Sequence, residues 1–299
     1  MEVQEILIPL LWGEGPKQPF ELRMGLSIVE FSHELRKDWL KGGKDFRVHR
    51  VLHLATHALH GCSPRTPQAV LLNHESERIE DFLTSLRLLV EGDIGRGPQY
   101  QRMLVDGHVD DSAYMFHPIW EAPFRVNTSK VSTADLSAAE NLSERVKTLR
   151  TANPNLSLAL RRFNYSYTRD LPADELLDLT VGLESLFAVD GPGEIGYKIA
   201  ARSARLLSYP PKEHDIAAVR ALYKVRSEIV HGGHYEKIQD SKALIRLAGP
   251  NVRLPSGAHE TVTAARQVAR NYVRAALRAY LAHPLAGDAN GIVKALDMT

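Results

Sequence analysis

At 299 residues, the chain has room for one large or two modest domains, and its 44% hydrophobic and 24% charged residues are ordinary for a globular protein that buries a core. A formal net charge of +1 excludes a uniformly basic nucleic-acid binder, so any contact with RNA must come from a local patch. The single cysteine, Cys62, excludes an intrachain disulfide framework and fits a reducing compartment.

The first residues, MEVQEILIPLLW, carry acids where a signal peptide needs a basic region. No apolar run approaches the length of a membrane span. We therefore expect a cytoplasmic protein with no membrane partner.

The N-terminal part of the chain predicts a mixed α+β domain. Short apolar runs at 3–12 and 20–31 indicate two strands around a turn. Apolar residues at helical spacing predict helices at 45–59 and 80–90, and the alternation over 100–126 indicates strands or ordered loop.

Histidines recur along one side of the helix expected at 45–59, at His49, His53, His57 and His60. Histidines four residues apart on a helix have adequate geometry for a metal ion, which leaves open a metal hydrolase built on His49, His53 and His57. The acidic base of the metalloprotease pattern is missing, and 13 histidines make chance clustering easy. We favour a partly solvated helix face, and predict no metal and no cofactor.

The character of the sequence changes at Ser132-Thr-Ala-Asp135, a capping-box pattern that begins a helical region. We expect a mixed N-terminal domain over 1–131, a helical domain over 132–283 and a loose tail over 284–299. The expected helices lie near 136–151, 156–169, 172–189, 194–207, 213–231 and 258–283. Short Pro- and Gly-containing connections predict antiparallel neighbours, so the protein should be mainly α with an up-and-down bundle.

The helix expected at 213–231 carries the clearest chemical signal. Its apolar stripe, read backwards, runs through Val230, Arg226, Tyr223, Val219 and Ile216. A guanidinium on an apolar stripe is too costly to bury alone, so Arg226 needs a carboxylate or an anionic ligand.

A carboxylate stands in a similar position upstream. The stripe Leu177, Val181, Glu184 and Phe187 places Glu184 among apolar neighbours on the helix expected at 172–189. We predict a buried Glu184–Arg226 pair. Such a pair can fix the register of two packed helices or belong to a functional site, and the residues leave both readings open.

His231 ends the same helix, where Gly232 and Gly233 supply a left-handed cap. Imidazole suits proton transfer near neutral pH, although a histidine at a helix end also favours the C-terminal dipole. Five residues rotate an unbroken helix by about 140°, so Arg226 and His231 would not share a face. Either the last turn unwinds, or a second chain completes the site.

These residues carry a resemblance to a known family. The stretch RSEIVHGG resembles the Arg-x4-6-His signature of the HEPN superfamily. The segment LLDLTVGLESLFAVDGPGEIGYKIAARSARLL, from Leu176 to Leu207, followed by LYKVRSEIVHGG, is similar in order and spacing to the Apea-like HEPN branch. The resemblance covers roughly residues 133 to 283.

The resemblance implies a metal-independent endoribonuclease that acts as a homodimer, with two such motifs facing across a cleft. His231 would act as general base or acid on a ribose 2′-OH, and Arg226 would neutralise the phosphorane charge. Ser227 would add a donor, although active members commonly have Asn, Asp or His there, and Glu184 would orient Arg226. Prokaryotic defence or toxin action is the implied context. The alternative is a non-catalytic HEPN module that binds RNA, a nucleotide or a regulatory partner protein.

The last long helix carries arginines at steps of four on the side away from its apolar residues: Arg266, Arg270, Arg274 and Arg278. Such a stripe can follow a phosphate backbone, although solvated charged faces are common and we favour that reading. The candidate RNA-binding set is completed by Lys224 and His234.

Overall fold

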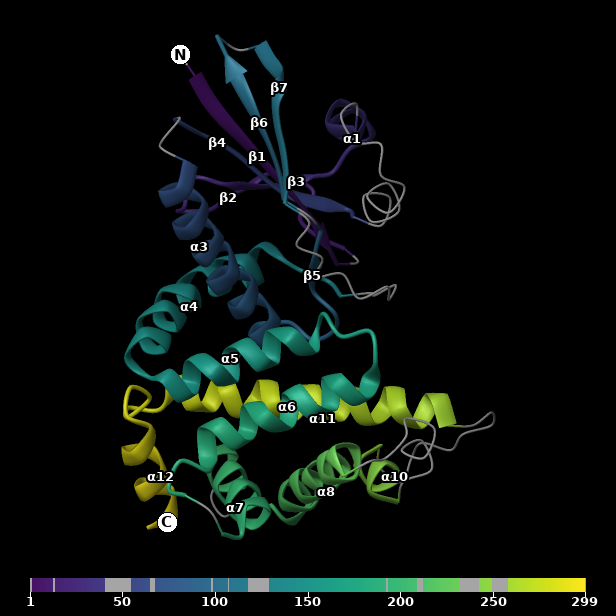
Figure 1. Cartoon of the computed structure of the whole chain (residues 1–299), viewed down its shortest axis with the longest axis vertical. Helices are drawn as coiled ribbons and strands as arrows, with labels where there is room; N and C mark the ends of the chain where they lie inside the picture. The colour runs from purple at the N-terminus through teal and green to yellow at the C-terminus, as the bar shows by residue number, and fades with distance from the viewer. Residues whose placement is uncertain are drawn as a thin grey trace. The chain divides into compact units, whose positions relative to one another are not determined.

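The computed structural model describes residues 2–12, 14–40, 55–64, 68–97, 99–106, 108–117, 129–191, 193–208, 212–231, 242–248 and 258–298. Over these residues the protein is mainly helical, with an antiparallel sheet in its N-terminal region (Figure 1). The chain divides into two compact units, Met1–Glu144 and Arg145–Thr299. The predicted boundary at 131 and 132 marks the start of helix α4 (Thr133–Ala152), and the division falls inside that helix.

The sheet of the N-terminal unit has strand order β2-β3-β4-β1-β6-β7, and β5 also pairs with β1. Its strands are β1 (Glu2–Leu11), β2 (Phe20–Glu21), β3 (Ser27–Glu30), β4 (His57–Pro64), β5 (Gly95–Arg96), β6 (Gln99–Val105) and β7 (His108–His117). The central strand is β1, whose apolar run buries Ile6, Ile8 and Leu10 on one face and Leu7 on the other. A strand that is apolar on both faces belongs inside a sheet.

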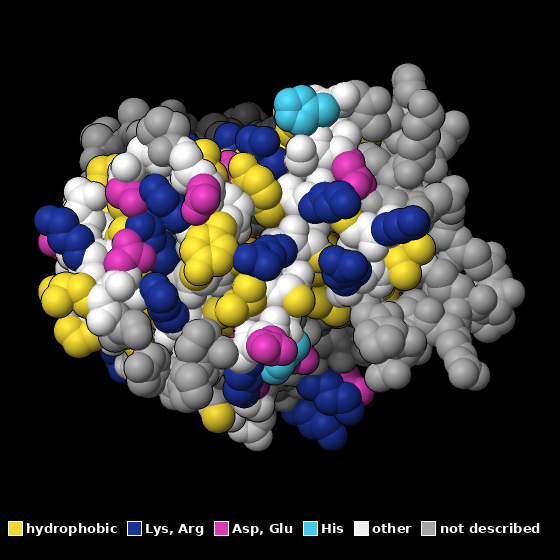
Figure 2. Space-filling model, turned by 90° about the horizontal axis from the view of Figure 1, so that it is seen from below, with side chains coloured by type: hydrophobic (Ala, Val, Ile, Leu, Met, Phe, Trp, Pro, Cys, Tyr) yellow, Lys and Arg dark blue, Asp and Glu magenta, His cyan; other side chains and the backbone are white. Residues whose placement is uncertain are grey.

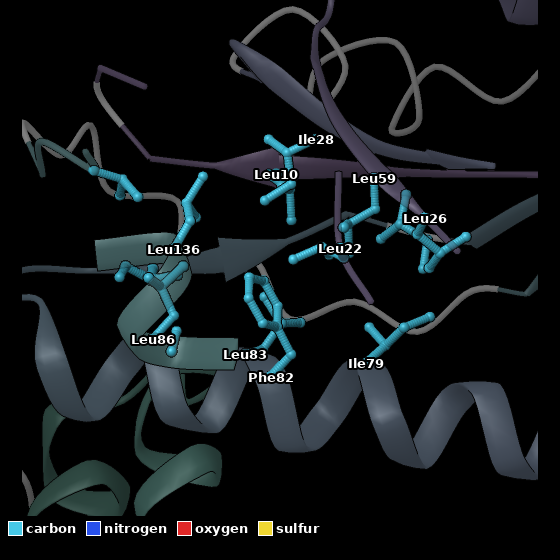
Figure 3. Close-up of a cluster of buried hydrophobic side chains, with 14 of the residues drawn as sticks. Leu10, Leu22, Leu26, Ile28, Leu59, Ile79, Phe82, Leu83, Leu86 and Leu136 are labelled. Carbon is cyan, nitrogen blue, oxygen red and sulfur yellow. The ribbon is translucent and has the colours of Figure 1, made fainter. Parts of the chain in front are cut away.

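Helices cover both faces of this sheet. Helix α3 (Gln68–Leu89) presents Phe82, Leu83 and Leu86, spaced three and four apart, to the cluster around Leu10 (Figure 3). On the other face, Trp39 at the end of α1 (His33–Leu40) packs with Leu7 and the ring of Tyr100. The unit therefore has a core on each side of the sheet.

The N-terminal predictions hold in outline and fail in places. The run 20–31 forms two short strands, β2 and β3, joined by a turn in which Gly25 has φ of 82°. The helix predicted at 45–59 is wrong over His57 to Leu59, which lie in β4 and pair with β1; residues 45–54 lie outside the described residues. The helix predicted at 80–90 is the second half of α3.

The helices of the C-terminal unit follow the predicted segments closely. After α4 they are α5 (Pro154–Ser166), α6 (Pro172–Phe187), α7 (Ile195–Leu207), α8 (Glu213–Val230), α10 (Lys242–Ala248), α11 (Ala258–Ala282) and α12 (Ala289–Asp297). The capping box before α4 is confirmed, because Ser132 and Asp135 exchange side-chain to backbone hydrogen bonds. Asn153 caps α5 by accepting the N–H groups of Asn155 and Leu156.

Helix α6 is the centre of this unit, since it packs against α5, α7, α8 and α11. Leu179, Leu183, Leu186 and Phe187 along it are fully buried. The arrangement brings the side of α6 that carries Glu184 against α8.

The expectation of a loose tail over 284–299 is wrong. Asp288 caps α12 by accepting the N–H of Gly291, and Ile292, Val293 and Leu296 are buried at helical spacing. A further helix, α10, lies between the segments expected at 213–231 and 258–283, and its Leu244 and Leu247 are buried.

Candidate functional site

The predicted pair between Glu184 and Arg226 is present. Arg226 Nε lies 3.3 Å from Glu184 Oε1, and the two side chains keep 27% and 21% of their surface exposed. The pair therefore lies at the margin of the core with one side open to water, so an incoming group can reach it.

The apolar stripes predicted for the two helices form the edges of their buried faces. Tyr223 and Val181 are half-buried, and Val230 keeps 49% of its surface exposed. Most of the core comes from neighbouring positions: Leu176, Leu179 and Leu183 on α6, and Leu222 and Val225 on α8. Phe187 and Val219 are the members of the predicted stripes that are themselves buried. Each helix is rotated by about one residue from the predicted stripe, roughly 100°, so the two charges meet at the rim.

Burial affects the protonation of the two partners differently. Burial raises the pKa of the Glu184 carboxyl above its ordinary value of 4.5, and the attraction of Arg226 opposes this only in part. A guanidinium keeps its charge at any physiological pH. Arg226 Nε is buried and has no hydrogen-bond partner in the described part of the chain. The guanidinium is held beside Glu184 through Nε, and 27% of the Arg226 side chain remains exposed.

His231 lies at the C-terminal end of α8 and is exposed. Its N–H donates to the Ser227 carbonyl at 3.0 Å, and α8 is continuous up to Val230. Between Arg226 and His231 there is consequently no unwinding, and the two side chains are separated by about 140° around the axis. Both are described, and no hydrogen bond or ion pair joins them. Within one chain the two halves of the predicted site stay apart.

Other residues near the motif are placed as follows. Ser227 is half-buried and Lys224 is exposed on α8. His234, Gly232 and Gly233 lie outside the described residues. Seen from the end of the unit that holds α7 and α8, Lys and Arg side chains are interspersed with hydrophobic and acidic ones (Figure 2).

An open hollow of about 650 Å³ adjoins the pair, a feature that the sequence did not reveal. It is lined by Gly193, Glu194, Ile195, Gly196 and Tyr197 at the start of α7 and by Tyr223 of α8. The guanidinium carbon of Arg226 lies 5.9 Å from the centre of the Tyr223 ring. The hollow and the Arg226 site thus share the Tyr223 side chain.

The exposed arginine stripe predicted for α11 is wrong at three of its four positions. Arg266, Arg270 and Arg274 are buried, and only Arg278 is exposed. Glu175 of α6, itself fully buried, pairs with Arg266 and Arg270. A carboxylate about 90 positions away in the sequence therefore draws these guanidinium groups inward, and they are unavailable to follow a phosphate backbone.

Aromatic contacts complete this buried cluster. Arg270 Cζ lies 4.4 Å from the centre of the Tyr167 ring, and Arg274 donates to the Tyr167 hydroxyl at 3.1 Å. The cluster joins α5, α6 and α11. Its arginines stabilise the bundle.

The histidine pattern assembles no metal site in the described part of the chain. His57 accepts from Trp12 Nε1 at 3.1 Å through Nδ1, and its Nε2 lies 2.9 Å from the Pro16 carbonyl, as expected of a neutral ring with the proton on Nε2. His60 instead pairs with the Glu5 carboxylate. His49 and His53 lie outside the described residues, and no group of three potential ligands occurs among the residues that were placed.

Comparisons with protein-family models, with curated proteins and with solved structures found no match. Within the described ranges, no helix is both long enough and apolar enough to cross a membrane.

Proposed function

We propose that the chain is a metal-independent endoribonuclease of the HEPN kind, with Arg226 and His231 as its catalytic residues. The observation that carries the proposal is the state of Arg226. Its guanidinium is partly buried and is held through Nε by a carboxyl whose own pKa is raised, while 27% of the side chain remains exposed. A fixed and partly exposed cation beside an open hollow suits a phosphate.

In this mechanism His231 takes the proton of a ribose 2′-OH as the 2′ oxygen attacks its own phosphorus. The bond from phosphorus to the 5′ oxygen breaks, and the leaving oxygen takes a proton from water. The products are a 2′,3′-cyclic phosphate and a 5′-OH. Arg226 neutralises the charge that develops on the phosphorane, Ser227 adds a donor, and Glu184 orients Arg226.

The site is completed by a second copy of the chain. On the continuous helix α8, Arg226 and His231 lie about 140° apart around the axis, from which we infer that the two act on one phosphate from different copies. In a symmetric homodimer, Arg226 of one copy and His231 of the other face the same phosphate, and two equivalent sites result. We place this activity in the cytoplasm, as a prokaryotic defence or toxin effector.

The test is cleavage of unstructured RNA in the presence of EDTA. The wild type should cut the RNA and leave cyclic phosphate ends, whereas His231→Ala and Arg226→Ala should each reduce the rate by about a hundredfold or more. His214→Ala is the matched control, since His214 is an exposed histidine at the other end of the same helix. Cleavage that persists in both site variants, or that requires a divalent metal, would overturn the mechanism.

A second candidate is a non-catalytic module that binds RNA, a nucleotide or a protein partner. Two observations favour it: the separation of Arg226 from His231 within one chain, and the serine that follows Arg226. This candidate predicts RNA binding without turnover in the same assay, and a binding affinity that His231→Ala leaves unchanged.

A further inference from the structure

The hollow between the start of α7 and α8 has an unusual wall, made of two tyrosine rings in different settings. Tyr197 keeps 53% of its surface exposed. Tyr223 is half-buried and lies against the backbone of α7, because a Cβ at Gly196 would come within 2.8 Å of Tyr223 Cδ1. Glycine at 196 allows this close approach. The Tyr223 ring is therefore fixed by packing, whereas the Tyr197 ring is exposed to solvent.

Each ring is accompanied by a guanidinium. Arg220 Cζ lies 5.4 Å from the centre of the Tyr197 ring, and Arg226 Cζ lies 5.9 Å from that of Tyr223. Arg220, Tyr223 and Arg226 follow one another at steps of three on α8, so Tyr223 lies about 60° around the axis from each arginine. Rings and cations thus alternate along the edge of the hollow.

This combination matches the chemistry of a nucleotide in single-stranded nucleic acid. Such sites pair an aromatic face, on which a base stacks, with a cation that contacts the backbone phosphate. The volume of about 650 Å³ falls within the range of about 300–1,000 Å³ that is typical of small-molecule sites. A base within a duplex is already stacked on its neighbours, so an unpaired base is the better occupant.

We propose that this hollow is a stacking subsite for an unpaired RNA base, which places the adjoining phosphate beside Arg226. The inference rests on the proposed function, because it names how the same site holds its substrate. The base stacks on Tyr197 and Tyr223, and Arg220 contacts the next phosphate along the strand.

The test measures binding with an RNA that cannot be cut. A single-stranded oligonucleotide with every 2′-OH methylated cannot supply the attacking hydroxyl, so affinity for the full chain is separated from catalysis. At one fixed salt concentration, Tyr197→Ala should bind the RNA about tenfold more weakly than the wild type. This is the loss of affinity expected when an aromatic ring that stacks on one base is removed. Tyr197→Phe keeps the ring and should bind like the wild type.

The matched control is Tyr165→Ala. Tyr165 is 42% exposed and has Arg169 Cζ 5.5 Å from its ring centre, but it belongs to α5 and does not line the hollow. Its loss should leave the affinity unchanged. Equal affinity of Tyr197→Ala and the wild type would overturn the subsite, and so would an equal loss in Tyr165→Ala.

The two proposals fail separately. If cleavage is lost in His231→Ala while Tyr197→Ala binds normally, the nuclease stands and the subsite is discarded. If Tyr197→Ala binds weakly but unmodified RNA is never cut, the subsite stands on a protein that binds RNA without cleaving it.

Discussion

At the scale of single residues, the Glu184–Arg226 pair shows how a charge is kept at the rim of a core. The Arg226 side chain keeps 27% of its surface exposed, although its Nε is buried against Glu184. The carboxyl is less favourably placed, because burial outweighs the attraction of its partner. Such an arrangement orients the cation more than it stabilises the fold.

The raised pKa of Glu184 predicts a pH-dependent effect on stability. A carboxyl whose pKa is higher in the folded than in the unfolded state favours folding at low pH, and that contribution is lost as the pH rises through the folded pKa. Glu184→Gln removes the titration. We therefore expect this variant to gain stability relative to the wild type between about pH 4 and about pH 7, as measured by urea unfolding.

Asp190 serves as the control, because its contribution to stability should depend on pH in the opposite direction. Hydrogen bonds from Arg202 hold the pKa of the Asp190 carboxyl well below its usual range. Its stabilising contribution is present above the unfolded pKa and is lost as the pH falls through the folded value. Asp190→Asn should therefore lose stability relative to the wild type as the pH rises from about 2 to about 5, and should change little above that. If the two variants changed in the same direction, the account of Glu184 would be wrong.

At the scale of elements, helix α12 is held by two arginines of α7: the buried Arg202, and Arg205, which donates to the Leu296 carbonyl at 3.0 Å. Arg202 of α7 keeps only 3% of its side chain exposed and donates to Asp297 of α12, to Asp190 and to the Phe187 carbonyl. These bonds raise the pKa of Arg202 and lower that of Asp297. The short helix is thereby fastened to α7 at its C-terminal end.

We predict that Arg202→Met destabilises the protein by about 2–3 kcal/mol, less than for a fully buried pair because both carboxylates are partly in water. Proteolysis should also become faster in the connection before α12, since the helix loses its anchor. Lys198→Met is the control, because Lys198 contacts Asp190 at 3.1 Å without reaching α12. Equal protease resistance of Arg202→Met and the wild type would show that the apolar face of α12 suffices to hold it.

At the scale of the whole molecule, the sequence predicts the helices of the C-terminal unit well because proline and polar caps mark their ends. Pro154 and Pro172 begin their helices as expected. Contacts distant in the sequence were harder to foresee. The arginines of α11 turn inward because Glu175 meets them, and residues from His57 onward form a strand because β1 pairs with them. The hollow depends on how α7 packs on α8, which no local pattern encodes.

The candidate site, too, could be predicted from the sequence only in part. The Glu184–Arg226 pair followed from two charges on apolar stripes, which is a local signal that survives a rotation of each helix by one residue. The position of His231 depends on whether α8 unwinds before it, and the helix remains regular up to Val230. The site shared between two copies of the chain is our proposal, and it rests on the regular course of α8.

The central claim is that Arg226 of one copy and His231 of another act on the same phosphate. Its most direct test is the RNA-cleaving activity of a purified heterodimer of Arg226→Ala and His231→Ala chains, isolated through two different affinity tags. Such a heterodimer retains one intact pair of the two, so about half of the wild-type activity should return, although each variant alone is inactive. An inactive heterodimer, or chains that do not associate, would contradict the account.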